Sequence, residues 1–391
     1  MNELNRLASS RNAPIFPATL VVEDRLRQLF RAWAYIETRF DVLQPTGNYT
    51  PDELDRTYTV SDTASGAAAL RPDFTSLVAR EAATIGQAVV RPLRRCYAGS
   101  AFRRPQRVDE RRYEIRQAGV ELIGACGPLA DAEILSLASE GLAAIGLETA
   151  QIHLGHVGFI RALLRSSDLT DDVERVVCDL LARHDRPALS ALLKAQAISS
   201  NTANALVRIL DLIGNEDVLD QARRLTDEPD ALRALAELDA VFDLLERTDL
   251  PTPIILDLTE VRDRSYYTGI RFEGFDPASG FPVLRGGRYD DLLGQYGAGE
   301  PAVGCAFEVD RIAASCAPKR DESEVLLVRF PPAQWPEAVA KARALRAQNH
   351  RVAFDVLSFA PEDLAAYQAA HRVNRVVVLP SGKAQRAEGG C

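Results

Sequence analysis

Lysine is scarce in this chain. It occurs only at positions 194, 319, 341 and 383, so arginine supplies nearly all of the positive charge. Because arginine is used throughout, no single arginine-rich run indicates a function by itself. An excess of positive charge is also lacking, since 46 basic residues face 55 acidic ones and the net charge is −9. This balance argues against broad binding to nucleic acid or to anionic membranes, while a local basic site is allowed.

Paired cysteines are lacking as well. The six cysteines are scattered without a Cys-x-x-Cys pair, which gives zinc-ribbon and redox-motif interpretations little support. Reduced thiols in a cytoplasmic protein are the better interpretation. The first residues lack a basic-then-apolar signal sequence, and no run approaches the roughly 20 apolar residues that cross a bilayer. We therefore predict a cytoplasmic protein without a membrane segment.

A metal site is not expected. His153 and His156 could be two ligands on a helix, but Gly155 and Gly158 disfavour a helix at that place. No acidic third ligand lies nearby in the sequence. The pattern therefore gives no support to a metal centre.

The 391 residues are enough for two or three domains and a sizeable core. Residues 168–248 are rich in Leu, Ala, Asp and Arg with helical periodicity and almost no strand signal, which predicts an all-helical insertion. Asp168, Asn201 and Asp227 are plausible helix N-caps within it. The predicted domains are a core of residues 1–167 and 249–318, the insertion, an alternating strand–helix unit at 322–380, and a disordered tail at 381–391.

Two predicted strands, Cys96–Phe102 and Glu114–Ile123, are joined by a polar loop. Such a hairpin can place Arg103 and Arg111 over one ligand, because the planar guanidinium fork suits phosphate or carboxylate oxygens. A surface hairpin with solvated arginines explains this segment equally well.

Strand alternation places Gln117, Gly119 and Glu121 on one face of the second strand. A carboxylate at Glu121 close to Asp73 could hold an ammonium group. This signal is weak when it stands alone.

The segment Tyr266–Gly269 sets aromatic side chains beside a glycine that permits close backbone approach. On a strand the two tyrosines would face opposite ways, so one could line a pocket while the other packs. Arg262 could meet a ligand carboxylate or phosphate. Two core tyrosines with satisfied hydroxyls are the common alternative. The run from Gly286 to Asp290 predicts a glycine turn, and a hairpin is the favoured interpretation.

Several of these segments, taken together and in this order, resemble the signature segments of class II histidyl-tRNA synthetases. Several motifs in the right order are more specific than any one of them. The resemblance implies an α+β fold, an antiparallel sheet flanked by helices, and a dimer interface near Pro45. The matching segments are Leu70–Thr75, Phe102–Glu121, Glu260–Gly269, Gly286–Asp290 and Pro301–Arg311.

The resemblance also implies roles for individual residues. A histidine pocket is implied at Asp73, Thr75, Gln117, Glu121, Arg262, Tyr266 and Tyr267. ATP contacts are implied at Arg103, Arg111 and Arg311.

The chain departs from the synthetase pattern where ATP chemistry is expected. Phe74 and Glu308 stand where that family has glycine, Pro105 replaces a glutamate, and Arg116 replaces a histidine. A carboxylate at Glu308 would repel ATP phosphates by about 1–4 kcal/mol at about 4 Å. The unit at 322–380 is also short for an anticodon-binding domain. These departures imply a vestigial ATP site and no catalytic residues.

A chain that has lost the ATP site but keeps the pocket resembles the regulatory subunits of ATP phosphoribosyltransferase, which are a paralogous family. That resemblance implies a non-catalytic partner of a short catalytic subunit in the first step of histidine biosynthesis. It implies a hetero-oligomer that also self-dimerises, with histidine as the feedback effector, and no cofactor. A divergent histidyl-tRNA synthetase is the alternative, because Arg262 is retained. A ligase acting on another carrier ranks last.

Overall fold

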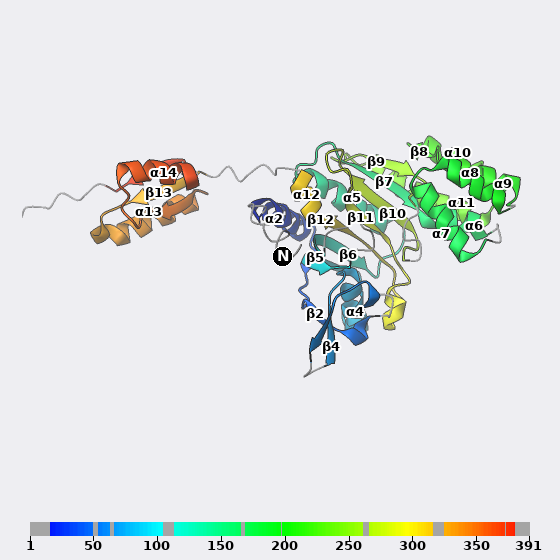
Figure 1. Cartoon of the computed structure of the whole chain (residues 1–391), viewed down its shortest axis with the longest axis horizontal. Helices are drawn as coiled ribbons and strands as arrows, with labels where there is room; N and C mark the ends of the chain where they lie inside the picture. The colour runs from blue at the N-terminus through cyan, green and yellow to red at the C-terminus, as the bar shows by residue number, and fades with distance from the viewer. Residues whose placement is uncertain are drawn as a thin grey trace, which may run out of the picture. The chain divides into compact units, whose positions relative to one another are not determined.

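The computed structural model describes residues 16–49, 54–62, 66–104, 113–165, 169–196, 198–260, 266–315, 324–371 and 373–379 (Figure 1). The chain forms two compact units, Met1–Pro318 and Lys319–Cys391, which are described separately.

A nine-stranded sheet forms the centre of the first unit, and most of its neighbours are antiparallel. Among the described strands of this sheet, only the pairs β1 (Ile36–Glu37) with β5 (Leu93–Phe102) and β7 (Gln151–His156) with β9 (Ile254–Asp257) are parallel. This arrangement confirms the predicted α+β fold with an antiparallel sheet. The order across the sheet is β1 (Ile36–Glu37), β5 (Leu93–Phe102), β6 (Glu114–Ile123), β12 (Ala302–Glu308), β11 (Pro282–Arg288), β10 (Ile270–Phe275), β7 (Gln151–His156), β9 (Ile254–Asp257) and β8 (Ile213–Gly214).

The two faces of this sheet differ in chemistry because side chains alternate along each strand. Cys96, Val120 and Cys305 are neighbours across three strands and lie in the main hydrophobic core. On the opposite face, the row that crosses β5, β6, β12, β11 and β10 is polar and glycine-containing. Its members, in order, are Tyr97, Gly119, Ala306, Arg285 and Glu273.

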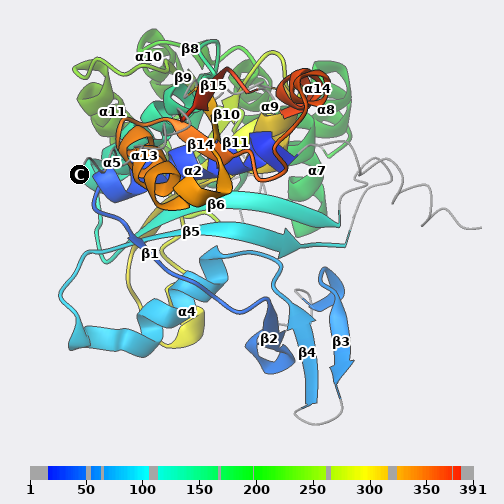
Figure 2. The same ribbon diagram turned by 90° about the vertical axis from the view of Figure 1, so that its left-hand side faces the viewer.

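Helices α2 (Phe16–Ala32), α5 (Pro128–Ala144) and α12 (Val309–Ser315) pack on the apolar face. Helix α4 (Thr75–Ile85) packs on the other face, where Val78, Ala79 and Ala82 join Tyr97 in a smaller core. Figure 2 shows α2 and α4 on opposite sides of β5 and β6. The chain enters α4 from a small antiparallel sheet of β2 (Leu43–Pro45), β4 (Gly66–Leu70) and β3 (Thr59–Asp62).

Helices dominate between β7 and β9. They are α6 (Val157–Arg165), α7 (Asp171–Ala182), α8 (Arg186–Ala195), α9 (Ser200–Ile209), α10 (Asp217–Arg223) and α11 (Pro229–Glu246). Two predicted N-caps are wrong by one or two residues: Ser199 caps α9, and Glu228 occupies the N-cap of α11. Asn201 lies inside α9. The helix is capped two residues earlier, where the Ser199 hydroxyl accepts a hydrogen bond from the backbone N–H of Thr202. Asp168 lies outside the described residues.

The second unit follows the predicted alternation of strand and helix. Its parallel sheet has the order β14 (Arg351–Phe354), β13 (Val325–Arg329), β15 (Arg375–Val378), with helices α13 (Trp335–Ala347) and α14 (Pro361–His371) between the strands in sequence. Leu326, Val328, Ala338 and Leu345 form its core. Short 3-10 turns complete the two units at Thr46–Asn48, Gly86–Ala88, Leu293–Tyr296 and Pro332–Gln334.

Candidate functional site

Glycines make room for the side chains of the site on the polar face of the sheet. Gly304 on β12 faces Glu121 on β6, and a Cβ at Gly304 would overlap the Glu121 carboxylate. A Cβ at Gly119 would come within 2.5 Å of the Tyr97 hydroxyl. The side chains of Glu121 and Tyr97 therefore lie over Gly304 and Gly119 of the neighbouring strands, in space that any residue larger than glycine would fill.

Glu121 is the centre of this site and is 1% exposed. Its carboxylate accepts hydrogen bonds from the hydroxyls of Thr75 (2.7 Å), Tyr97 (3.2 Å) and Tyr289. Burial raises the pKa of Glu121 to about 7, although the three hydroxyl donors lower it and the nearby charge of Asp73 raises it. A cation that entered the site would find a desolvated carboxylate with its donors already in place.

Asp73 lies at the start of α4, beside Glu121. Its Oδ1 accepts the backbone N–H of Ser76 at 2.9 Å and the Ser76 hydroxyl at 2.6 Å. This is the local geometry of a residue that ends an extended segment and satisfies the first turn of a helix. The position of Asp73 is therefore set by the helix start, as the sequence Asp-Phe-Thr-Ser allows.

Phe74 packs within the wall of the site. Its ring stacks on Tyr97 at 4.5 Å between centroids, and the Arg71 guanidinium lies 4.3 Å from the ring centroid. Phe74 is 2% exposed. A large side chain at this position supports Tyr97, one of the donors to Glu121.

Tyr266 and Tyr267 form an aromatic wall with Tyr289. The Tyr266 ring stacks on Tyr289 at 5.3 Å, and Tyr267 meets Tyr266 edge-on at 4.9 Å. Both tyrosines precede β10 (Ile270–Phe275), so the alternation that they would have on a strand does not apply to them. The Tyr267 carbonyl instead accepts a hydrogen bond of 3.0 Å from Arg161 on α6.

The predicted glycine turn is also wrong. Gly286 and Gly287 lie inside β11 and pair with both neighbouring strands. A Cβ at Gly287 would come within 2.7 Å of the Tyr267 ring. Glycine is needed at this position because an aromatic side chain crosses the strand.

A row of charges, buried except for the partly exposed Arg285, also lies on the polar face. The Arg285 guanidinium donates to Glu308 (3.4 Å) and to Glu273 (3.1 Å). Arg271 donates to Glu273 at 2.5 Å and pairs with Glu260. We call this row the charge ladder: Glu308, Arg285, Glu273, Arg271 and Glu260.

Gln117 joins the charge ladder instead of facing Glu121. Its Nε2 donates to Glu308 Oε1 at 3.1 Å, and both side chains are buried. Tyr97, Tyr289, Arg285 and Glu273 are site residues that the sequence did not predict. Tyr289 lies in the segment Gly286–Asp290, which resembles a family motif. No local pattern in the sequence connects Tyr97, Arg285 or Glu273 to Glu121 or to Glu308.

The arginines predicted to hold ATP have main-chain partners where they are described. Arg103 Nε donates to the Pro72 carbonyl at 2.7 Å, which places it beside Asp73. Arg311 donates to the Pro282 carbonyl at 3.0 Å and lies 5.4 Å from the Phe281 ring centroid. Arg111 and Arg262 lie outside the described residues. The structure therefore brings together Asp73, Thr75, Glu121, Tyr266 and Tyr267.

Other parts of the described chain offer less chemistry. His153 contacts Asp257 at 2.9 Å and His156 contacts Glu237 at 3.2 Å, so the two histidines have separate carboxylate partners. Within the described ranges, no three His, Cys, Asp or Glu side chains gather as a metal site would require. Likewise, none of the described helices combines the length and apolarity of a membrane span.

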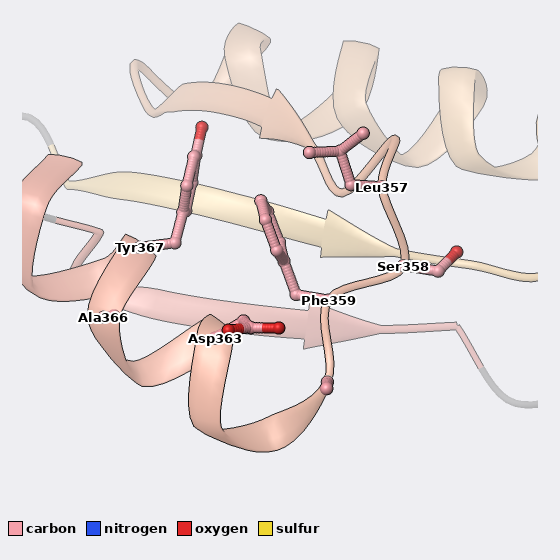
Figure 3. A pocket seen from close by; sticks show the side chains of 7 residues that line it. Leu357, Ser358, Phe359, Asp363, Ala366 and Tyr367 are labelled. Atoms are coloured by element: carbon pink, nitrogen blue, oxygen red, sulfur yellow. The ribbon is translucent and has the colours of Figure 1, made fainter.

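The second unit has an open hollow of about 680 Å³ beside α14 (Figure 3). Phe359 and Tyr367 line it, with a ring distance of 4.7 Å, together with the carboxylate of Asp363. Among the described residues that line it, Asp363 is the one charged residue, and the hydroxyls of Ser358 and Tyr367 point in other directions, so the hollow has no convergent set of polar groups for a specific ligand (Figure 3).

Comparisons with known proteins agree with the fold and the motifs. Residues 18–312 match the histidyl-tRNA synthetase family. The ATP phosphoribosyltransferase regulatory subunit of Desulfitobacterium hafniense is 34% identical over 86% of this chain and 88% of that protein. The corresponding protein of Geobacter sulfurreducens is 31% identical over 92% of this chain and 84% of that protein.

Solved structures give the same fold. An ATP phosphoribosyltransferase regulatory subunit/histidyl-tRNA synthetase from Bacillus halodurans superposes with a TM-score of 0.80 at 24% identity, covering 94% of this chain and 95% of that one. The histidyl-tRNA synthetase of Nostoc superposes with a TM-score of 0.77 at 16% identity, covering 91% and 86%. The chain belongs to the family of ATP phosphoribosyltransferase regulatory subunits, which has the fold of the histidyl-tRNA synthetases.

Proposed function

We propose that this chain activates the short catalytic subunit of ATP phosphoribosyltransferase, senses histidine and catalyses no reaction itself. Through this activation the chain acts in the first step of histidine biosynthesis. The proposal places it in the cytoplasm as part of a hetero-oligomer. The observation that carries the proposal is the contrast within one sheet face: a preformed carboxylate site at Glu121 lies beside a region filled by the charge ladder.

The proposed histidine pocket is supported by its chemistry. Glu121 and Asp73 supply carboxylates for the cationic groups of an amino acid, and Thr75 holds Glu121 in place. Tyr266 and Tyr267 supply aromatic surface beside them. Arg262 belongs to the proposed pocket by its position in the family motif alone.

The proposed loss of catalysis is supported by the charge ladder. It holds carboxylates at Glu308, Glu273 and Glu260 against two guanidiniums, both of which are already paired. A polyphosphate on this face would meet uncompensated negative charge, at a cost of about 1–4 kcal/mol for each contact near 4 Å. Arg103, Arg111 and Arg311 are then remnants of an ATP site.

Regulation is proposed to work by coupling between two subunits. Association shifts the catalytic subunit toward its active state, and bound histidine shifts the equilibrium back. Because such coupling is reciprocal, the catalytic subunit must change the affinity for histidine by the same factor. Self-association through the segment near Pro45 is supported by three exposed apolar side chains, Ile36, Val42 and Leu43, at 62%, 41% and 50% exposure.

Calorimetry of the purified chain with histidine and, separately, with ATP tests the pocket. We expect binding of histidine and none of ATP, and Thr75→Val should weaken histidine binding because Glu121 loses a donor. The exposed substitution Glu114→Gln, on the strand that carries Glu121, is the matched control. Binding of both ligands together with histidine-dependent pyrophosphate exchange would instead favour a divergent histidyl-tRNA synthetase.

A second assay tests activation. The chain should raise the rate of phosphoribosyl transfer by the short catalytic subunit, and histidine should reduce that rate. Absence of any rate increase on mixing would refute the proposed regulatory role.

A further inference from the structure

We propose that Glu308 is a positioning residue that fixes the side-chain amide of Gln117 and thereby selects for a ligand amine. The inference rests on the proposed function, and it extends the proposed pocket along β6 from Glu121 to Gln117. It assigns Glu308 a role inside that pocket, in addition to the repulsion of phosphate.

The first step is the orientation of the amide. Gln117 and Glu308 are directly opposed on β6 and β12, and Nε2 donates to Glu308 Oε1 at 3.1 Å. An ionised carboxylate only accepts hydrogen bonds, so the nitrogen of Gln117 must face it and the oxygen must point away. Glu308 thus removes the ambiguity that a glutamine amide has when its neighbours can both donate and accept.

The second step is the amide oxygen of Gln117, Oε1, which is the atom that remains for a ligand. Gln117 is 6% exposed, and among the described residues its side chain hydrogen-bonds only to Glu308, through Nε2. Its Oε1 is therefore an acceptor in a nearly buried residue without a protein partner in the described part of the chain. Oε1 is not one of the buried side-chain atoms that lack a partner, so it reaches solvent and can accept a hydrogen bond from water or from a ligand.

The third step is the support of Glu308 itself. Arg285 on β11 donates to Glu308 at 3.4 Å and to Glu273 at 3.1 Å. A guanidinium has only donors, so this contact leaves the Glu308 carboxylate in the role of acceptor and limits its movement. Arg285 cannot replace Gln117 as a ligand contact while it bridges two carboxylates.

The fourth step is the class of ligand. Gln117 and Glu121 lie four residues apart on one face of β6, roughly 13 Å between Cα atoms at the usual strand rise. Both present acceptors, an amide oxygen at one place and a carboxylate at the other. The arrangement fits a small molecule with donor groups at both ends, such as an amino acid with a protonated amine and a polar side chain.

The experiment compares two probes by calorimetry: histidine and its deamino analogue, imidazole propionic acid. We expect the wild-type protein to bind histidine more tightly. Glu308→Gln should reduce that preference about tenfold, or about 1.4 kcal/mol, because a glutamine at 308 lets the Gln117 amide turn over. In a Gln117→Leu background the same substitution should change the preference by less than twofold.

A second variant guards against misfolding at the buried position. Arg285 has a side chain that is 35% exposed, and Arg285→Gln should lower the preference about threefold through a looser Glu308. Glu114→Gln, at an exposed position of β6, should leave it unchanged.

The outcomes separate the two proposals. A wild-type protein that binds neither probe contradicts the histidine pocket of the proposed function, whereas one that binds both equally overturns the selection for a ligand amine. A wild-type protein that prefers histidine, with the preference unchanged in Glu308→Gln and in Arg285→Gln, overturns the positioning role and leaves the pocket intact. An equal effect of Glu308→Gln with and without Gln117 also overturns it, since the effect then bypasses the amide.

Discussion

Replacing Glu121 with glutamine should change how the stability of the first unit depends on pH. Burial raises the pKa of Glu121 from 4.5 to about 7. Between these values the native state holds a proton that the unfolded state releases. The free energy of unfolding therefore falls as the pH rises through this window, and the loss is complete above pH 7.

The magnitude follows from the shift. About 2.5 units at 1.36 kcal/mol each correspond to roughly 3 kcal/mol between pH 4 and pH 8. Other carboxylates also titrate there, but they are shared by the wild type and the variant. The difference between the two proteins in their pH dependence isolates Glu121.

Urea denaturation followed by tryptophan fluorescence measures this difference. The chain has two tryptophans, Trp33 against the main core and Trp335 in the second unit. In a Trp335→Phe background, Trp33 reports on the first unit alone. Glu114→Gln on the same strand, at an exposed position, is the matched control and should show the wild-type pH dependence.

Parallel stability curves for the wild type and Glu121→Gln from pH 4 to pH 8 would refute the reasoning. They would mean that the three hydroxyl donors offset burial completely. Ligand binding gives an independent check. A cationic ligand favours the ionised carboxylate, so the affinity for histidine should rise with pH toward 7.

Two further substitutions test the packing of the site. Gly304→Ala should lower the melting temperature by several degrees, because its Cβ would overlap Glu121, whereas Gly299→Ala, with no atom within 4 Å of the added Cβ, should leave it within a degree. Arg288→Met should destabilise the first unit by about 3–5 kcal/mol in urea denaturation at pH 8, since it leaves buried Asp131 without its guanidinium partner. A loss below 1 kcal/mol would contradict that account. The loss should shrink at low pH, where Asp131 becomes protonated.

The local elements were predictable from the sequence because their signals are local. The predicted strands Cys96–Phe102 and Glu114–Ile123 correspond to β5 and β6, with the start of β5 three residues earlier. Periodicity over ten residues is enough to define such elements. The family followed from several motifs in one order, and the comparisons confirm it. The domain boundaries and the roles of the site residues stay predictions.

Errors arose where tertiary packing decides the local structure. Gly286 and Gly287 have the composition of a turn, yet they continue β11 because Tyr267 crosses the strand there. Tyr266 and Tyr267 have high strand propensity, yet they precede β10 and pack against each other. Propensity is a weak guide when an aromatic side chain of one segment requires space in another.

The sequence by itself determined the family, the order of the elements and the presence of Glu121 and Glu308 in the site motifs. Only the tertiary structure decided what surrounds these two carboxylates. Tyr97 and Tyr289 reach Glu121 from 24 and 168 residues away, and Gln117 meets Glu308 across 191 residues. Strand pairing makes these contacts, and burial then sets the charge state of Glu121. Neither pairing nor burial is a property of a short stretch of sequence.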